Sequence, residues 1–149
     1  MPTFDVTGSH APAATTSPLN ITGSATLRAR ITHVRAGTTG IPSSEASVQV
    51  FGRLSTTAGT GTAVTPGPRN GVSVAGSSAL SNLSAEPTYT AGQPKILLEF
   101  NPRLFAQWTA YDLNAAIESL AAAANGIGFQ TQIAGGALTT IDVDCDLNE

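Results

Sequence analysis

The sequence has little charge, few aromatic side chains, and almost no cysteine or histidine. Charged residues make up 11% of its 149 residues, against about 25% in a typical soluble domain. Aromatic residues make up 5%, and there are two histidines and one cysteine, Cys145. A single cysteine excludes an internal disulfide and a cysteine-based zinc site. Two histidines leave little for histidine-based chemistry.

The balance of charges argues against two classes of partner. Seven Lys and Arg stand against ten Asp and Glu, giving a formal net charge of −3 and a pI of about 5.2. This composition offers no basic face for nucleic acid. No apolar run approaches the roughly 18 residues that a membrane helix needs. We therefore expect neither a nucleic-acid partner nor a membrane partner.

The pattern that is present is apolar alternation, which is typical of strands. Apolar and polar side chains alternate in residues 27–33, 46–54 and 95–101, which predicts strands with one face buried. A closing hairpin is expected between 127–133 and 138–147, and Cys145 alternates with Val143 as a small buried hydrophobe. Many of the hydrophobic residues are alanine, so the core should be thin.

Together these short strands predict an all-β protein with a single β-sandwich domain over residues 21–149. The spacing fits either a jelly-roll or an immunoglobulin-like topology. Residues 55–71 are rich in Gly, Thr and Pro and are expected to form a long exposed loop. One short helix is expected at 112–124, because Leu113, Ile117 and Leu120 recur at helical spacing and Asp112 suits its N-cap.

Residues 1–20 are expected to form an extended N-terminal arm. Prolines interrupt regular structure there, and the only large apolar side chains are those of Phe4, Val6 and Leu19. Such a segment is either a disordered terminus or an arm that becomes ordered on a neighbouring subunit. In the second case these three side chains would bind the partner.

Three aspartates on the last strand are the most suggestive group for chemistry. Asp142, Asp144 and Asp146 alternate and should point to one face, where carboxylates could begin a calcium site. The alternative, which we favour, is an exposed face paired with arginines of a neighbouring strand, namely Arg28, Arg30 or Arg35. No metal or other cofactor is expected.

The remaining candidates also have two interpretations. His33 should lie on the apolar side of its strand, where a core or interface histidine is favoured over a catalytic base. Trp108 and Tyr111, near Phe105, could form a stacking platform for sugar, but a core strand or a subunit contact is favoured. No residue is nominated as catalytic, so an enzyme is not expected.

Three segments resemble a known group of proteins. They are Leu27–Gly37 (LRARITHVRAG), 125–129 (NGIGF) and the closing strand 139–144 (TTIDVD). The pattern resembles small virion-associated capsid decoration, or cement, proteins of tailed phages. The resemblance implies a β-sandwich on the outer capsid surface that binds the major capsid protein, often as a trimer. It supplies no catalytic residues.

The leading hypothesis is therefore a viral structural protein that stabilises the assembled head by bridging neighbouring capsid subunits. The alternative is a carbohydrate- or receptor-binding β-sandwich module of a phage tail or fibre. In either case the expected partner-binding residues are apolar or aromatic: Phe4, Val6, Leu19, Trp108 and Tyr111.

Overall fold

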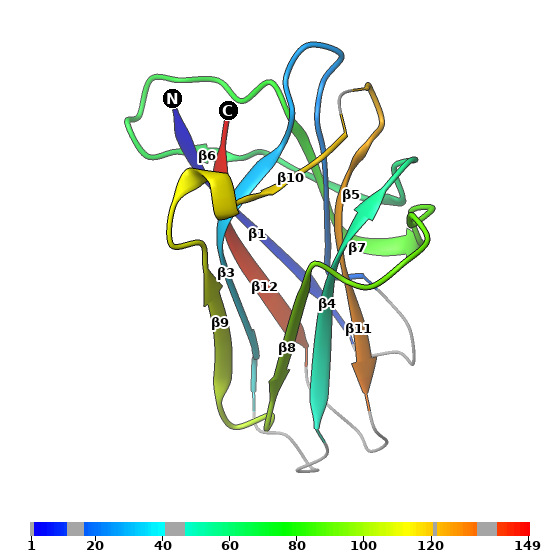
Figure 1. Cartoon of the computed structure of the whole chain (residues 1–149). Coiled ribbons are helices and arrows are strands. Elements are labelled where there is room, and N and C mark those ends of the chain that lie inside the picture. The colour runs from blue at the N-terminus through cyan, green and yellow to red at the C-terminus, as the bar shows by residue number, and fades with distance from the viewer. Residues whose placement is uncertain (1, 12–16, 41–46, 121, 134–139) are drawn as a thin grey trace.

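The computed structural model describes residues 2–11, 17–40, 47–120, 122–133 and 140–149, and these form a β-sandwich. Its two six-stranded antiparallel sheets pack face to face (Figure 1). The first sheet runs β10-β3-β12-β1-β6, with β9 also paired to β3, and the second runs β5-β7-β2-β11-β4-β8.

The strands of the first sheet are β1 (Thr3–His10), β3 (Arg30–Thr38), β6 (Gly67–Pro68), β9 (Phe105–Thr109), β10 (Ile117–Glu118) and β12 (Ile141–Asn148). Those of the second sheet are β2 (Leu19–Thr22), β4 (Val48–Ser55), β5 (Thr60–Val64), β7 (Ser78–Ala85), β8 (Ile96–Phe100) and β11 (Gly126–Ile133).

The strand order defines a jelly-roll. Strands pair in nested fashion along the chain: β1 with β12, β2 with β11, β3 with β9, and β4 with β8. The sheets are thus built on the orders β1-β12-β3-β9 and β2-β11-β4-β8. In an immunoglobulin-like sandwich the first two strands share a sheet, whereas β1 and β2 lie in different sheets. The structure therefore selects the jelly-roll, with β5–β7 and β10 as additions to it.

The core lies between the sheets and is formed by alternate side chains of the strands. On β8, Ile96, Leu98 and Phe100 are 4–6% exposed, while Leu97 on the opposite face is 54% exposed. The alternation expected for residues 95–101 is confirmed, as is the burial of Cys145 at 0% exposure. The expected hairpin is wrong, because β11 and β12 lie in different sheets and pair with other strands.

The N-terminal segment belongs to the sandwich instead of forming an arm. β1 pairs with β12 over its whole length and with β6 near its start. Phe4 and Leu19 are 0% exposed and Val6 is 1% exposed. The reason is that Phe4 and Val6 alternate in register with the buried side chains of β12, so both strands bury the same face. Residues 12–16, in the middle of the expected arm, lie outside the described residues.

The expected helix at 112–124 is replaced by a single 3₁₀ turn at Leu113–Ala115 followed by β10. Asp112 caps the turn as expected, and its Oδ1 accepts hydrogen bonds from the backbone nitrogens of Asn114 and Ala115 at 2.7 and 3.0 Å. Of the three side chains of the expected helical face, Leu113 and Leu120 are 49% and 48% exposed, and Ile117 alone is buried, at 8%. A three-turn helix is marginal without packing along that face, and Ile117 instead pairs with β3.

Residues 55–71 also differ from the exposed loop that their composition predicts. They contain β5 and β6, which extend the second and first sheets respectively. β6 pairs with β1, and the backbone nitrogen of Arg69 donates a 3.0 Å hydrogen bond to the Thr3 carbonyl. The segment that looked like an exposed loop therefore adds a strand to each sheet.

Candidate functional site

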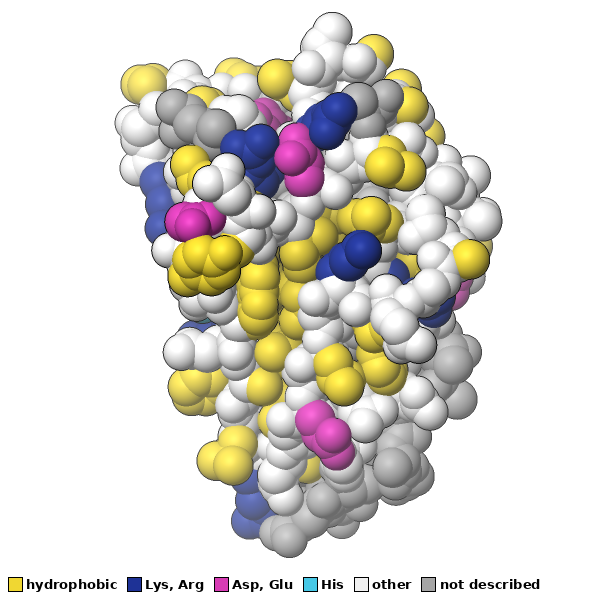
Figure 2. Space-filling view, in the orientation of Figure 1, with side chains coloured by type: hydrophobic (Ala, Val, Ile, Leu, Met, Phe, Trp, Pro, Cys, Tyr) yellow, Lys and Arg dark blue, Asp and Glu magenta, His cyan; other side chains and the backbone are white. Residues whose placement is uncertain are grey.

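One hollow opens at the edge of the sandwich, between the end of β9, β10 and the residue that precedes β8. Strands β8 and β9 are joined through residues 101–104 and diverge from that connection (Figure 1). The hollow has a volume of about 570 Å³, within the range of roughly 300–1,000 Å³ for small-molecule sites. Figure 2 shows hydrophobic side chains gathered between the sheets on this face, with charged side chains around them. We call this hollow the edge groove; the side chains used below are Leu54, Lys95, Trp108, Tyr111, Ile117 and Glu118.

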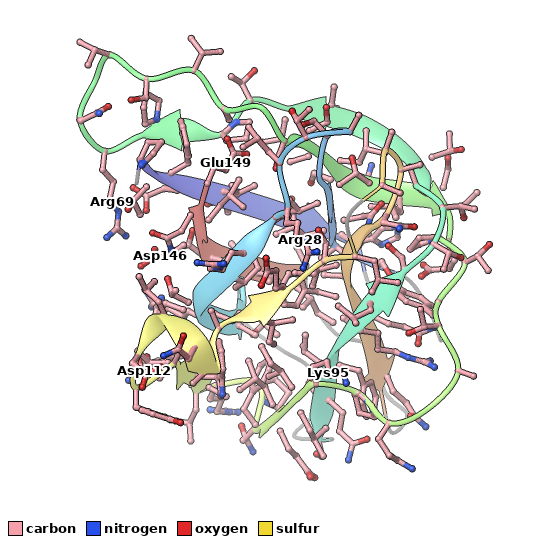
Figure 3. The ribbon with its side chains drawn as sticks, turned by 45° about the horizontal axis from the view of Figure 1, so that its top comes forward. Arg28, Arg69, Lys95, Asp112, Asp146 and Glu149 are labelled. Carbon is pink, nitrogen blue, oxygen red and sulfur yellow. The ribbon has the colours of Figure 1, made fainter. Side chains whose placement is uncertain are left out.

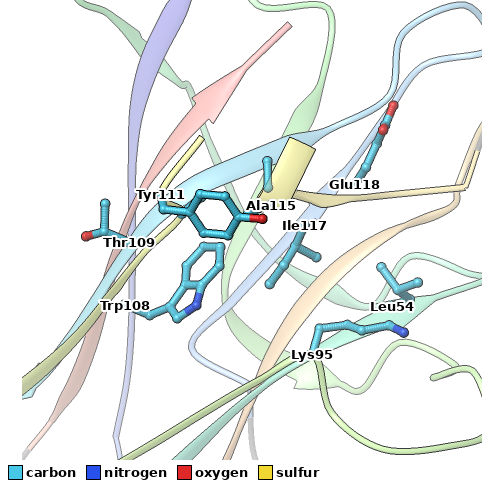
Figure 4. Close-up of a pocket in the computed structure, with 10 residues that line it drawn as sticks. Leu54, Lys95, Trp108, Thr109, Tyr111, Ala115, Ile117 and Glu118 are labelled. Atoms are coloured by element: carbon cyan, nitrogen blue, oxygen red, sulfur yellow. The ribbon is translucent and has the colours of Figure 1, made fainter. Parts of the chain in front are cut away.

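Two aromatic side chains form one side of the edge groove (Figure 4). Trp108 lies opposite Val34 on the inner side of β9, where it is half-buried and packs against the core. Tyr111 follows the end of β9 and is 89% exposed. Both expected platform residues therefore line the same hollow, and Trp108 is also a core contact.

Phe105 does not belong to this platform. It lies three residues before Trp108 on the same strand, so the alternation of the strand places it on the outer face. It is 55% exposed, and the guanidinium carbon of Arg35 lies 4.7 Å from the centre of its ring. The aromatic cluster seen in the sequence is thus divided between the two faces of β9.

Two charged side chains stand across the edge groove from the rings (Figure 4). The Glu118 carboxylate lies 3.6 Å from Arg28 and 3.4 Å from Arg30, and Glu118 is the cross-strand neighbour of Arg30. Lys95 precedes β8 and is anchored by its backbone nitrogen, which donates a 2.7 Å hydrogen bond to the Gly52 carbonyl. Its ammonium group has no ion-pair partner among the described residues.

The three aspartates of β12 lie on the outer face of the first sheet and have partners from other segments. Figure 3 shows Asp146 beside its partner Arg69. Thr39 donates a hydrogen bond to Asp142, and Thr7 donates one of 2.9 Å to Asp144. Arg69 lies 2.5 Å from Asp146 and also pairs with Asp5 at 2.7 Å. The ion pair on this face is thus made by Arg69 and not by the arginines expected.

Those arginines are engaged elsewhere. Arg28 and Arg30 pair with Glu118, whereas Arg35 lies opposite Asp144 in register and stacks on Phe105. Burial raises the pKa of Asp146, while Arg69 opposes that shift. Over the described part of the chain, no group of three or more His, Cys, Asp or Glu side chains is arranged to hold a metal ion.

His33 lies on the outer face with the aspartates and not on the apolar side that the sequence predicts. The register of β3 and β12 shifts between the pairs Asp146–His33 and Leu147–Ile31, which is a β-bulge at Thr32. The extra residue reverses the facing of the side chains that follow it. Sequence alternation alone contains no signal for such a bulge.

A second surface was missed by sequence reasoning. The loop of residues 69–77, which we call the valine loop, carries Val72 at 84% and Val74 at 90% exposure. Its backbone is held by side chains: Asn70 accepts hydrogen bonds from the nitrogens of Val72 and Ser73, and Glu149 accepts 2.7 Å bonds from those of Gly76 and Ser77. A β-branched pair among Gly, Ser and Asn residues is the signal that the sequence offers for this surface.

Comparison of the chain with family models, curated proteins and solved structures gave no match. Within the described ranges, no helix has the length and hydrophobicity to span a membrane.

Proposed function

We propose that this protein is a structural protein of a virion, which decorates the outer capsid surface of a tailed phage and stabilises the head by bridging neighbouring major capsid subunits. The observation that carries the proposal is the valine loop. Two large apolar side chains are almost fully exposed on a backbone that hydrogen bonds hold in place. Contiguous exposed apolar patches mark protein contacts, and we propose that Val72 and Val74 form part of such a patch.

The valine loop is suited to contact because little must become ordered when it binds. Side chains and loops that are fixed on association reduce affinity, so a loop already anchored by Asn70 and Glu149 keeps more of its binding free energy. Leu27 enlarges this surface: it is 41% exposed, and its Cδ1 lies only 2.5 Å from the position that a Cβ on Gly76 would take. The two chain ends lie near the same end of the sandwich (Figure 1).

Two further properties support a place in an assembly. The jelly-roll recurs in viral capsid proteins, although lectins share it. The charged fraction of 11% reduces repulsion between closely packed copies. These properties agree with the resemblance of the sequence to decoration proteins, but the contact surface changes. We assign the contact with the capsid to the valine loop and not to a free N-terminal arm, because Phe4 and Val6 are buried in this chain's own core.

The test is co-sedimentation of the purified chain with assembled capsid shells that lack it, compared with free capsid subunits. The chain should sediment with shells only. A double variant, Val72→Ser with Val74→Ser, should bind at least about tenfold more weakly, as for loss of contact hot spots. Leu97→Ser is the matched control, because Leu97 is 54% exposed on the outer face of the second sheet.

Equal shell binding by the double variant, or no binding by the unaltered chain, would contradict the proposal. Equal urea midpoints for the three proteins would show that the variants fold. Light scattering of the full chain tests the expected trimer separately. Removing residues 1–20 is unsuitable for that purpose because the deletion includes β1 and β2.

A further inference from the structure

We infer that the edge groove binds a sugar ring that carries a carboxylate. This inference goes beyond the proposed function and does not rest on it, because the edge groove shares no residue with the valine loop. It rests on the aromatic side chains, the charges and the shape of the groove.

The aromatic side supplies a flat apolar surface. Tyr111 is 89% exposed even though its ring lies over the hollow beside that of Trp108 (Figure 4). Buried or half-buried indole nitrogens usually have a hydrogen-bond acceptor, but that of Trp108 has none among the residues described. The pair thus offers two ring faces and one unused donor. A pyranose presents the matching surface, an apolar face of C–H groups edged with hydroxyls.

The opposite side supplies polar groups. The Glu118 carboxylate is held between Arg28 and Arg30 at 3.6 and 3.4 Å, which fixes an acceptor for a sugar hydroxyl. Lys95 also lies across the hollow from the rings and adds an ammonium donor there (Figure 4). Leu54 and Ile117 form an apolar surface between them. A few polar groups around an apolar surface are the usual composition of a small-ligand site.

The charge around the groove favours an acidic sugar over a neutral one. The charged side chains among the residues that line the groove are those of Lys95 and Glu118. Glu118 is already paired with Arg28 and Arg30, whereas Lys95 has no ion-pair partner among the described residues, so Lys95 is the charge that remains for a ligand. Asp112 is next to Tyr111, but it does not line the groove and its Oδ1 caps the following turn. A carboxylate on the sugar would complement Lys95.

The experiment titrates the full chain with tetrasaccharides of hyaluronan, alginate and polygalacturonate, and with N-acetylchitotetraose as a neutral probe. Trp108 is the only tryptophan, so its fluorescence reports directly on the edge groove. At least one acidic probe should change the fluorescence and bind, by calorimetry, about tenfold more tightly than the neutral probe. No heat or fluorescence change with any acidic probe at millimolar concentration would overturn the inference.

Three variants define which side chains bind. Tyr111→Ala should weaken calorimetric binding about tenfold, and Lys95→Gln should remove the preference for the acidic probe. Phe105→Ala should bind as the unaltered chain does, since Phe105 lies on the outer face of the same strand. Equal binding of acidic and neutral probes that Lys95→Gln leaves unchanged would overturn the requirement for a carboxylate.

One outcome would assign the groove to a different occupant. If Tyr111→Ala lowers the native mass measured by light scattering, a second copy of the chain covers the groove and the sugar inference is overturned. An unchanged mass together with weakened sugar binding supports it. Shell binding by the Val72 and Val74 variant is measured separately, so failure of the proposed function can be told apart from failure of this inference.

Discussion

The two lateral edges of the sandwich are completed in different ways. At one edge, the β5–β7 segment extends both sheets beyond β1 and β2, and Phe4 and Leu19 are fully buried. At the other edge, β8 ends the second sheet, while β9 and β10 share the remaining side of β3. The groove lies between these last strands. The comparison teaches that both edges of one jelly-roll can hold a hollow, one formed within an insertion and the other between strands that diverge.

The two edges also differ in chemistry. The insertion contains a second hollow of about 530 Å³, lined by residues between Ala63 and Leu80, and none of its lining side chains is charged. The edge groove includes Lys95 and Glu118 among its lining residues. Of these two hollows, only the edge groove can therefore bind a ligand through charge. The hollow in the insertion is uncharged, and its exposed Val74 suits contact with protein.

The largest expected effect tests whether the first edge is part of the core. Phe4→Ala should lower the free energy of unfolding by about 3–5 kcal/mol, because it removes a fully buried aromatic side chain. Phe105→Ala, at the open edge and 55% exposed, should cost less than about 1 kcal/mol. Urea unfolding measures both. A small loss for Phe4→Ala would mean that β1 is an external arm after all.

The next effect concerns how much room the structure leaves for an added methyl group at each edge. A Cβ on Gly8 would lie 2.4 Å from the Pro18 carbonyl oxygen, so Gly8→Ala should cost about 1–3 kcal/mol through overpacking. On the open side, a Cβ on Gly37 would meet its nearest atom, the Cβ of Phe105, at 3.5 Å. Gly37→Ala should therefore leave the urea midpoint nearly unchanged. Similar losses for both variants would remove the distinction between the edges.

A smaller effect is expected from the ion pairs that connect the insertion to the first sheet. Arg69→Gln removes the partner of Asp5 and Asp146, and should cost about 1 kcal/mol because Arg69 and Asp5 are half-exposed, at 51% and 52%, while Asp146 is 19% exposed. Urea unfolding at low and high salt should show that the loss shrinks as salt screens the charges. A loss that is independent of salt would point to packing of the arginine stem instead.

The same variant gives a pH dependence with a defined sign. Burial raises the folded-state pKa of Asp146, so ionisation of this group opposes folding, and Arg69 reduces that penalty. Without Arg69 the pKa should rise further. The loss of stability caused by Arg69→Gln should therefore be full at neutral pH. It should disappear as the pH falls through the Asp146 pKa, because a protonated Asp146 no longer needs Arg69. A loss that grows toward acid pH would contradict this assignment.

The smallest effect concerns Cys145, which lies in the core beside β1. Burial raises the pKa of its thiol, and its Sγ lies 3.6 Å from the Val6 carbonyl oxygen. An aromatic disulfide reagent at about pH 8 should therefore label the folded protein negligibly and the urea-unfolded protein fully. Rapid labelling of the folded protein would show that the edge next to β1 opens readily.

Some of the fold could be predicted from local patterns, because they depend on neighbouring residues only. The alternation at residues 95–101 correctly gives the buried face of β8, and Asp112 is the cap that its type suggests. The prediction of a helix at 112–124 was wrong, because helical spacing of apolar residues indicates a possible face but not whether another element packs against it. Of the candidate site, Trp108 and Tyr111 were named, but Lys95 and Glu118 were not considered as parts of it.

The sequence by itself determined that this chain is β-rich and which side chains of several strands, such as β8 and β12, are buried, since a period of two is a local property. Only the tertiary structure decided which strands pair. Val6 meets Cys145, and β2 meets β11, through contacts that alternation cannot encode because every alternating strand offers the same pattern. The bulge that turns His33 outward depends on those pairings, as does the divergence of β8 and β9. The edge groove therefore exists only because strands far apart in the chain end beside one another.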